Sequence, residues 1–229
     1  MDLKKEAAIK AISFIKGKSK IGLGAGSTIA HIVNFLAMDM VAGQELSLFT
    51  SSFTTHQLLL EKGFSVRHTG DIAELDIYFD GCDQVDKDLN AVKSGGGIHT
   101  REKLLASMAQ LFILVGDQAK YTSRFDVKYP LVIEVLPEAL FFVPYQVHKL
   151  FPGARVSQRM SDRTDGAVIT FNGNYLLDVW FTEWPEPGPI NQSVKLITGV
   201  VETSLFYNLA QKAIIAYNEG VIVHEKPIG

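Results

Sequence analysis

Short apolar segments alternate with longer amphipathic segments through the first half of the chain, and this rhythm constrains the fold more than any other feature. Short strands are predicted at residues 20–24, 46–50, 64–68, 76–80 and 111–116. Apolar residues three and four apart predict helices at 3–15, 27–41, 55–62 and 100–110. Strands that alternate with helices form parallel sheets covered by helices. We therefore expect an α/β domain with a Rossmann-like, mostly parallel sheet and helices on both faces.

The order of elements changes after about residue 121. Strands are predicted at 131–136, 155–160 and 199–206, helices at 138–150 and 189–197, and a hairpin over 167–182 that turns at Asn172-Gly173. This βαββαβ order is that of a ferredoxin-like unit. The short strands at 213–217 and 221–224 are expected to rejoin the first sheet. We expect a catalytic domain of residues 1–126 and 207–229, with a small α+β domain of residues 127–206 inserted into it.

Composition excludes several classes of partner. The 22 Lys and Arg against 25 Asp and Glu give a net charge of −3 without a basic run, so nucleic acid is not expected. No apolar run approaches the roughly 18 residues of a membrane span, and lysines interrupt residues 1–20, so neither a membrane nor export is expected. The single cysteine, Cys82, forbids an internal disulfide, which favours the cytoplasm. The six histidines lack metal-ligand spacing, so no metal is expected.

A glycine-rich turn, Gly22 to Thr28, joins the first predicted strand to a helix. Glycines let the backbone approach a ligand, and the free N–H groups at a helix start favour a phosphate. The Rossmann fingerprint needs a glycine where Ser27 stands, and a P-loop needs a lysine that this turn lacks. The turn therefore suits a single phosphate, as on a sugar, better than a nucleotide. An ordinary turn in which Ser27 or Thr28 caps the helix explains the pattern equally well.

A second hydroxyl-rich turn, Thr50 to Thr55, follows a strand in the same way. Ligands collect at the carboxyl ends of strands in a doubly wound sheet. Ser51 and Ser52 are therefore candidates to share the phosphate pocket, and a simple capped turn is the alternative.

Two carboxylates, Asp80 and Asp83, follow the predicted strand at 76–80, a position where general acid/base groups are commonly mounted. The stretch 86–97 matches only half of a calcium loop, because Ala91 and Gly97 stand where that loop needs glycine and glutamate. Calcium is therefore not expected. The acidic residues at 86 and 88 are predicted to be solvated loop charges.

The stretch from Lys93 to Glu102 combines a lysine, a glycine cluster and a helix start. Consecutive glycines present N–H groups that bind an oxyanion. Thr100 is the predicted helix cap, and in the first turn of that helix the dipole favours the ionised form of Glu102, which keeps it available as a base. The alternative is that Glu102 only stabilises the helix start.

In this order and spacing, the motifs resemble those of the type A family of ribose-5-phosphate isomerases. The resemblance covers nearly the whole chain. It rests on the glycine turn, on Asp80-Gly-x-Asp83, on Lys93 with its glycines, on Thr100-Arg101-Glu102-Lys103 and on Asn172-Gly173-Asn174. That family interconverts ribose 5-phosphate and ribulose 5-phosphate in the pentose phosphate pathway, without a metal or organic cofactor.

The resemblance implies a role for each candidate residue. Glu102 would move a proton between C2 and C1 through an enediol, and Asp80 would assist opening of the furanose ring. Asp83 and Lys93 would act on the charge of the sugar oxygens. Backbone donors would come from Gly95, Gly96 and Gly97. The phosphate would contact Lys4, Gly24, Gly26, Ser27, Thr28 and Lys120, with Ser51 and Ser52 as further candidates. A cytoplasmic homodimer or dimer of dimers is also implied.

Three residues depart from the family pattern: Gln84 replaces a glutamate, Ser94 a glycine and Phe171 an aspartate. None is among the four proposed catalytic side chains. A sugar-phosphate sensor on the same fold would keep the phosphate loop and lose the catalytic groups, which this chain retains. A related deaminase would be expected to bring a catalytic histidine with acidic partners, and a coenzyme A transferase a glutamate nucleophile in a longer chain.

Overall fold

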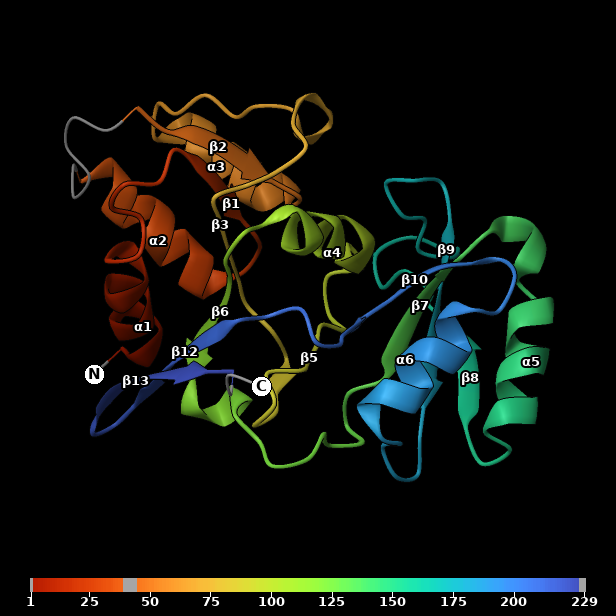
Figure 1. The fold of residues 1–229 in the computed structure, drawn as a ribbon. Helices are drawn as coiled ribbons and strands as arrows, with labels where there is room; N and C mark the ends of the chain where they lie inside the picture. The colour runs from red at the N-terminus through yellow and green to blue at the C-terminus, as the bar shows by residue number, and fades with distance from the viewer. Residues whose placement is uncertain (1, 39–44, 227–229) are drawn as a thin grey trace.

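The computed structural model describes residues 2–38 and 45–226, and its largest element is a six-stranded sheet (Figure 1). Its strands lie in the order β13-β12-β6-β3-β1-β2. They are β1 (Lys20–Leu23), β2 (Ser47–Thr50), β3 (Ile77–Asp80), β6 (Phe112–Asp117), β12 (Lys212–Tyr217) and β13 (Gly220–Glu225). All neighbours are parallel except β12 and β13. The predicted Rossmann-like sheet is confirmed, including the return of the last two strands. The strand order reverses between β1 and β3, which is where ligand sites form in such sheets.

Helices cover both faces of this sheet. The first face is covered by α1 (Leu3–Ile12), α2 (Ser27–Ala37) and α3 (Phe53–Glu61), and the second by α4 (His99–Met108). The predicted end of the second helix, residues 39–41, lies outside the described residues. The strand predicted at 64–68 is wrong: a single bridge joins Val66 to Leu48. Its apolar residues pack against the core without a ladder of hydrogen bonds, and a 3-10 turn at Thr69–Asp71 follows.

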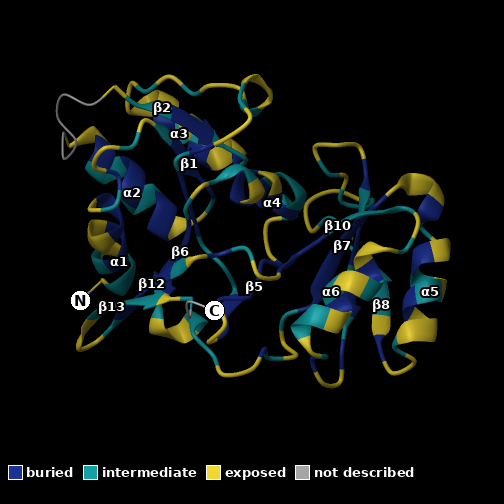
Figure 2. Cartoon of the chain, in the orientation of Figure 1, coloured by how far each residue is buried: buried dark blue, intermediate teal, exposed yellow. Residues whose placement is uncertain are grey.

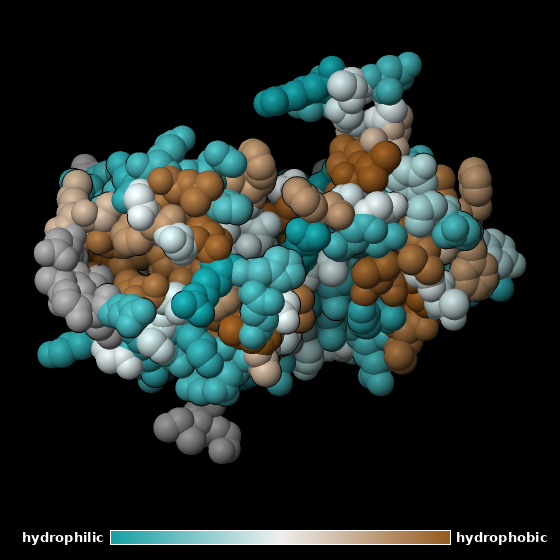
Figure 3. Space-filling model, turned by 90° about the horizontal axis from the view of Figure 1, so that it is seen from above, coloured by the Kyte–Doolittle hydropathy of each residue, from teal (hydrophilic) through white to brown (hydrophobic). Residues whose placement is uncertain are grey.

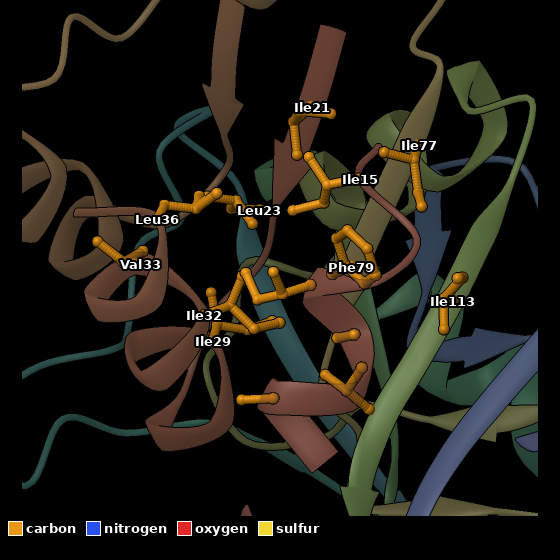
Figure 4. Close-up of a cluster of buried hydrophobic side chains, with 14 of the residues drawn as sticks. Ile15, Ile21, Leu23, Ile29, Ile32, Val33, Leu36, Ile77, Phe79 and Ile113 are labelled. Carbon is orange, nitrogen blue, oxygen red and sulfur yellow. The ribbon is translucent and has the colours of Figure 1, made fainter. Parts of the chain in front are cut away.

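Alternation along β3 determines which residue faces the future site. Ile77 and Phe79 point into the cluster with α1 and α2, where they meet Ile21 and Ile29 (Figure 4). Tyr78 belongs to the cluster on the opposite face, with α4. Successive side chains of a strand point to opposite faces, so the last residue of β3 lies on the α4 side. Figure 2 shows how completely these central strands are buried.

A second, four-stranded antiparallel sheet forms a small lobe beside the first. Its elements are β7 (Leu131–Val135), α5 (Phe142–Leu150), β8 (Arg155–Gln158), β9 (Tyr175–Trp180), α6 (Pro187–Lys195) and β10 (Val200–Thr203). The strand order β10-β7-β9-β8 and the βαββαβ chain order confirm the ferredoxin-like unit. The domain limits at residues 126 and 207 stay a prediction.

Two predicted strands of this lobe differ in detail. The first arm of the hairpin over 167–182 is not a strand, because residues 167–174 pair only through isolated bridges. The strand predicted at 199–206 divides into β10 and β11 (Leu205–Phe206), which lie in different sheets. A three-stranded sheet joins β11 to β5 (Ala91–Val92) and β4 (Gln84–Val85). The chain therefore passes between the two lobes at Ser204.

Two features bear on contact with a membrane or another protein: the length of the helices and the apolar side chains exposed on the surface. Within residues 2–38 and 45–226, no helix is long and apolar enough to cross a bilayer. Apolar residues lie exposed on the small lobe, among them Phe141, Tyr145 and Leu196. Figure 3 shows hydrophobic patches among hydrophilic residues toward that end of the molecule.

The packing of β1 against β3 predicts a stability difference between two glycines. A methyl group at Gly22 would lie 2.6 Å from Tyr78 Cδ2 and 2.9 Å from Leu75 Cδ1, so Gly22→Ala overpacks the core and should cost about 1–3 kcal/mol. The matched change Gly153→Ala meets nothing nearer than 3.9 Å and should stay within about 0.5 kcal/mol. Urea unfolding of both variants measures the difference; equal losses would contradict this packing.

Candidate active site

A fully buried carboxylate, Asp80, joins the loop after β1 to the loop after β3, at the point where the strand order reverses. It accepts hydrogen bonds from the Tyr78 hydroxyl at 2.6 Å and from the backbone N–H groups of Gly81 at 2.8 Å and Ala25 at 3.1 Å. A side chain at Gly24 is excluded, because its Cβ would lie 1.9 Å from Asp80 Oδ1. The glycine therefore lets the loop after β1 close over the carboxyl end of β3.

Lys93 connects this carboxylate to the next one. Its Nζ lies 3.0 Å from Asp80 Oδ2 and 3.3 Å from Glu102 Oε1, and it donates to the Gly81 carbonyl. The lysine follows β5, where its N–H bonds the Ser204 carbonyl at 3.0 Å. Burial by itself lowers the Lys93 pKa, but the two carboxylates outweigh burial and the net pKa lies above its ordinary value. Lys93 is therefore a buried cation.

Glu102 lies buried in the first turn of α4, and its side chain faces Lys93. Burial first, and then the charge of Asp80, raise the pKa of Glu102 to about 8, while Lys93 opposes the shift. A carboxyl group that gains and loses its proton near neutral pH is suited to general acid/base work. The structure therefore places a titratable group at the entrance of a helix, beside a fixed positive charge.

The caps of the two helices at this site differ from the prediction. α4 begins after Ile98 without a side-chain cap, so the expected cap at Thr100 is wrong; the Thr100 hydroxyl donates to the Glu134 carboxylate instead. α2 begins after Gly26, whose φ of +99° suits glycine, and no side chain caps it. The alternative in which Ser27 or Thr28 serves as the cap is therefore not observed.

Lys93, Glu102 and the start of α2 lie around a cavity of about 330 Å³. Predicted residues that line it are Lys4, Gly26, Ser27, Thr28, Asp83, Lys93, Gly95, Gly96, Glu102 and Lys120. Sequence reasoning missed others, namely Ala25, Gly81, Cys82, Val115, Gly116 and Asp117. Gly116 and Asp117 are the last residues of β6, the neighbour of β3. Because ligands bind at the carboxyl ends of strands in such sheets, these two residues were predictable from the sequence.

Four predicted binding residues do not line this cavity. Gly24 packs against Asp80, and Gly97, with a φ of +67°, lies against Leu176 of the small lobe. Ser51 and Ser52 line a separate cleft of about 960 Å³. Ser52 also caps α3 by accepting the Thr55 N–H at 3.2 Å. For this turn the capped alternative is the one observed.

The residues that depart from the family pattern have structural partners. Gln84 Oε1 accepts the Asp126 N–H at 2.7 Å. The Ser94 N–H donates to Asp83 Oδ2 at 2.5 Å, which orients that carboxylate. Phe171 is exposed, and the Arg101 guanidinium lies 4.5 Å from its ring centre.

Two further predictions concern side chains other than Asp80, Lys93 and Glu102. The expected solvation of Asp86 is wrong: it is buried and accepts the Asn90 side-chain amide at 2.9 Å. Burial raises the pKa of the Cys82 thiol to about 12, which agrees with a space-filling role. In the described part of the chain, no three His, Cys, Asp or Glu side chains gather as metal ligands.

Comparison with known proteins points to one family. The family model of ribose 5-phosphate isomerase A (phosphoriboisomerase A) matches residues 48–220. Ribose-5-phosphate isomerase A of Thermosynechococcus vestitus is 35% identical over 98% of this chain and 94% of its own length. The Homo sapiens ribose-5-phosphate isomerase is 35% identical over 99% of this chain and 74% of its own length.

Solved structures agree. Ribose 5-phosphate isomerase A from Methanocaldococcus jannaschii superposes with a TM-score of 0.89 at 30% identity, over 98% of this chain and 99% of that one. A D-ribose-5-phosphate isomerase in complex with phospho-erythronic acid also has a TM-score of 0.89, at 32% identity over 98% of both chains.

The raised pKa of Glu102 predicts how stability depends on pH. Between its ordinary value of 4.5 and about 8, the folded chain holds a proton that the unfolded chain has lost, so Glu102 makes stability fall as pH rises through that window. Glu102→Gln removes this slope and should raise Tm by about 2–4 °C at pH 8 relative to the parent, with a smaller gain at pH 5. The exposed control Glu138→Gln should keep the parent slope. A gain for Glu102→Gln that is the same at both pH values would contradict the shift.

Proposed function

The chain belongs to the ribose 5-phosphate isomerase A family, and we propose that its Asp83, Lys93 and Glu102 carry out the interconversion of ribose 5-phosphate and ribulose 5-phosphate. The observation that carries this proposal is the shared cavity: Glu102 and Lys93 face the same space as the helix start at Ser27 and Thr28. A sugar phosphate fits such a space, with its anion at one end and its reacting carbons at the other.

Glu102 is the proposed base. An aldose to ketose shift needs one group that takes a proton from C2 and returns it to C1, through an enediol. Glu102 faces the cavity, and its pKa of about 8 lets it exchange a proton near neutral pH. When Glu102 accepts the proton it becomes neutral, so the charge of Lys93, 3.3 Å away, is left to stabilise the enediolate.

The two aspartates have different surroundings, which supports different roles. Asp83 lines the cavity, and the Ser94 N–H fixes its carboxylate, so it is the proposed group for proton transfer at the sugar oxygens and for ring opening. Asp80 is expected from the family to assist ring opening, but it is fully buried, with protein donors on both oxygens. Its contacts support a role in holding Lys93 and the glycine loop.

The phosphate is proposed to lie at the start of α2. The uncapped N–H groups and the hydroxyls of Ser27 and Thr28 are available there, and anions are favoured at helix N-termini. Lys4 and Lys120 bring positive charge to the same cavity. A cytoplasmic location and a homodimer or dimer of dimers remain predictions of the family resemblance.

A non-catalytic sensor is the alternative function. Binding alone needs the phosphate site but gains nothing from two buried carboxylates beside a lysine, since buried charges are costly. The presence of this cluster, with the pKa of Glu102 near neutrality, therefore favours the isomerase.

The assignment of the base predicts a selective loss. Purified protein in a chelator should equilibrate the two phosphopentoses, and Glu102→Gln should lower kcat by about 10³-fold or more while KM changes little, because the lost interaction serves proton transfer. The exposed control Glu138→Gln should keep full activity. A coupled spectroscopic assay measures all three. Parent protein without isomerase activity would refute the proposed function, and an active Glu102→Gln would remove Glu102 from the base role.

The pKa of Glu102 also predicts a pH profile. The ionised base becomes scarce below its pKa, so kcat/KM should fall about tenfold per pH unit below pH 8 and level off above it. Lys93 lowers the pKa of Glu102, so in Lys93→Ala the acid limb should move to higher pH. Initial rates from pH 5 to 10 test this, and an unmoved acid limb in the variant would contradict the contact.

A further inference from the structure

Another buried carboxylate, Glu134 of β7, lies in the small lobe and takes no part in the chemistry proposed above. It accepts hydrogen bonds from the hydroxyls of Thr100 and Thr170, the latter at 2.9 Å. The amide groups of Asn172 and Asn174 also donate to it, at 3.0 Å and 2.7 Å. The Asn172-Gly173-Asn174 motif thus has a defined partner.

All four donors are neutral side chains, yet Glu134 remains ionised. Burial alone would raise its pKa, but the four hydrogen bonds outweigh burial and lower the net pKa below its ordinary value. A buried carboxylate of this kind is costly to leave without donors. The turn geometry meets this need, because Gly173 has a φ of +81° and both flanking asparagines reach the same oxygen.

The Thr100 bond connects this carboxylate to the first turn of α4. Arg101 Nε donates to Asn172 Oδ1 at 3.3 Å, on the same side. Lys103 Nζ bonds the Thr203 carbonyl at 2.6 Å and Glu202 Oε1 at 2.8 Å, both of β10. Figure 1 shows α4 between the large sheet and the small lobe. Glu102 therefore lies in a helical turn whose other residues, Arg101 and Lys103 on either side of it and Thr100, bond to the small lobe.

We propose that Glu134 is a positioning residue for Glu102: through Thr100 it fixes the first turn of α4 on the Thr170–Asn174 turn, and so keeps Glu102 Oε1 at its 3.3 Å distance from Lys93 Nζ. This inference rests on the proposed role of Glu102 as the base. A misplacement of about 1 Å costs a positioned catalytic group about 10²-fold in rate. The inserted lobe thereby acts on the reaction without touching the cavity.

The matched pair Thr100→Val and Thr100→Ser tests the connection. Valine keeps the shape and removes the hydroxyl, so kcat should fall by about 10- to 100-fold with KM within about twofold of the parent. Because a displaced Glu102 loses the nearby charge of Lys93, the acid limb of kcat/KM should also move to higher pH. Serine keeps the hydroxyl and should restore both the rate and the profile.

Glu134→Gln should show the same split between kcat and KM, since it removes the charge and leaves one acceptor oxygen for the four donors. The control Val143→Ala, in the core of the same lobe, should lower Tm without moving the pH profile. If Thr100→Val keeps the parent kcat and pH profile, or loses activity only as Val143→Ala does, the inference is overturned. A parent with isomerase activity and an inactive Glu102→Gln would leave the proposed function intact in that case.

Discussion

A buried ammonium held between two buried carboxylates is the interaction on which the rest of the structure depends. Lys93 reaches Asp80 and Glu102 from a segment that neither β3 nor α4 contains, so three separate parts of the chain must meet at one point. Burial of the Glu102 carboxyl group, and then the charge of Asp80, raise the pKa of Glu102 more than the single lysine lowers it. The burial and like charge that make the ionised form of Glu102 costly also bring its pKa to about 8, which suits a base that exchanges a proton near neutral pH.

Such a cluster persists only in a rigid frame. Two hydrophobic cores enclose the large sheet, one under α1 and α2 and one under α4, and a third fills the small lobe. The close approach of Gly22 to Tyr78 and of Gly24 to Asp80 brings β1 and its loop against β3. The Tyr78 hydroxyl then meets one oxygen of Asp80 from within the sheet. Close packing therefore restrains the charged groups, which hydrogen bonds alone would hold less firmly.

The small lobe contributes to the same frame from the other side. Its strand β10 passes directly into β11, which pairs with β5 just before Lys93, while β7 carries Glu134 toward α4. The lobe thus holds the two segments that position the site: the backbone of Ser204 bonds Lys93, and Glu134 bonds Thr100 in the helix that carries Glu102. An insertion that bonds to the supports of a site is able to influence its rate without lining the cavity itself.

Periodicity in the local sequence predicted most of the strands and helices and the ferredoxin-like order, because it is a property of neighbouring residues. The family resemblance of the motifs, and not periodicity, predicted that Gly26, Ser27, Asp83, Lys93 and Glu102 share one site. Tertiary structure alone decided what each polar group bonds. Thr100 does not cap its helix but bonds a carboxylate 34 positions away. Asp80 does not line the cavity, and its carboxylate contacts Lys93 instead. Ser52 caps a helix, and residues 64–68 pack without a ladder. Burial, pKa and hydrogen-bond choice depend on groups far apart in the chain, whose positions exist only once the two lobes have packed together.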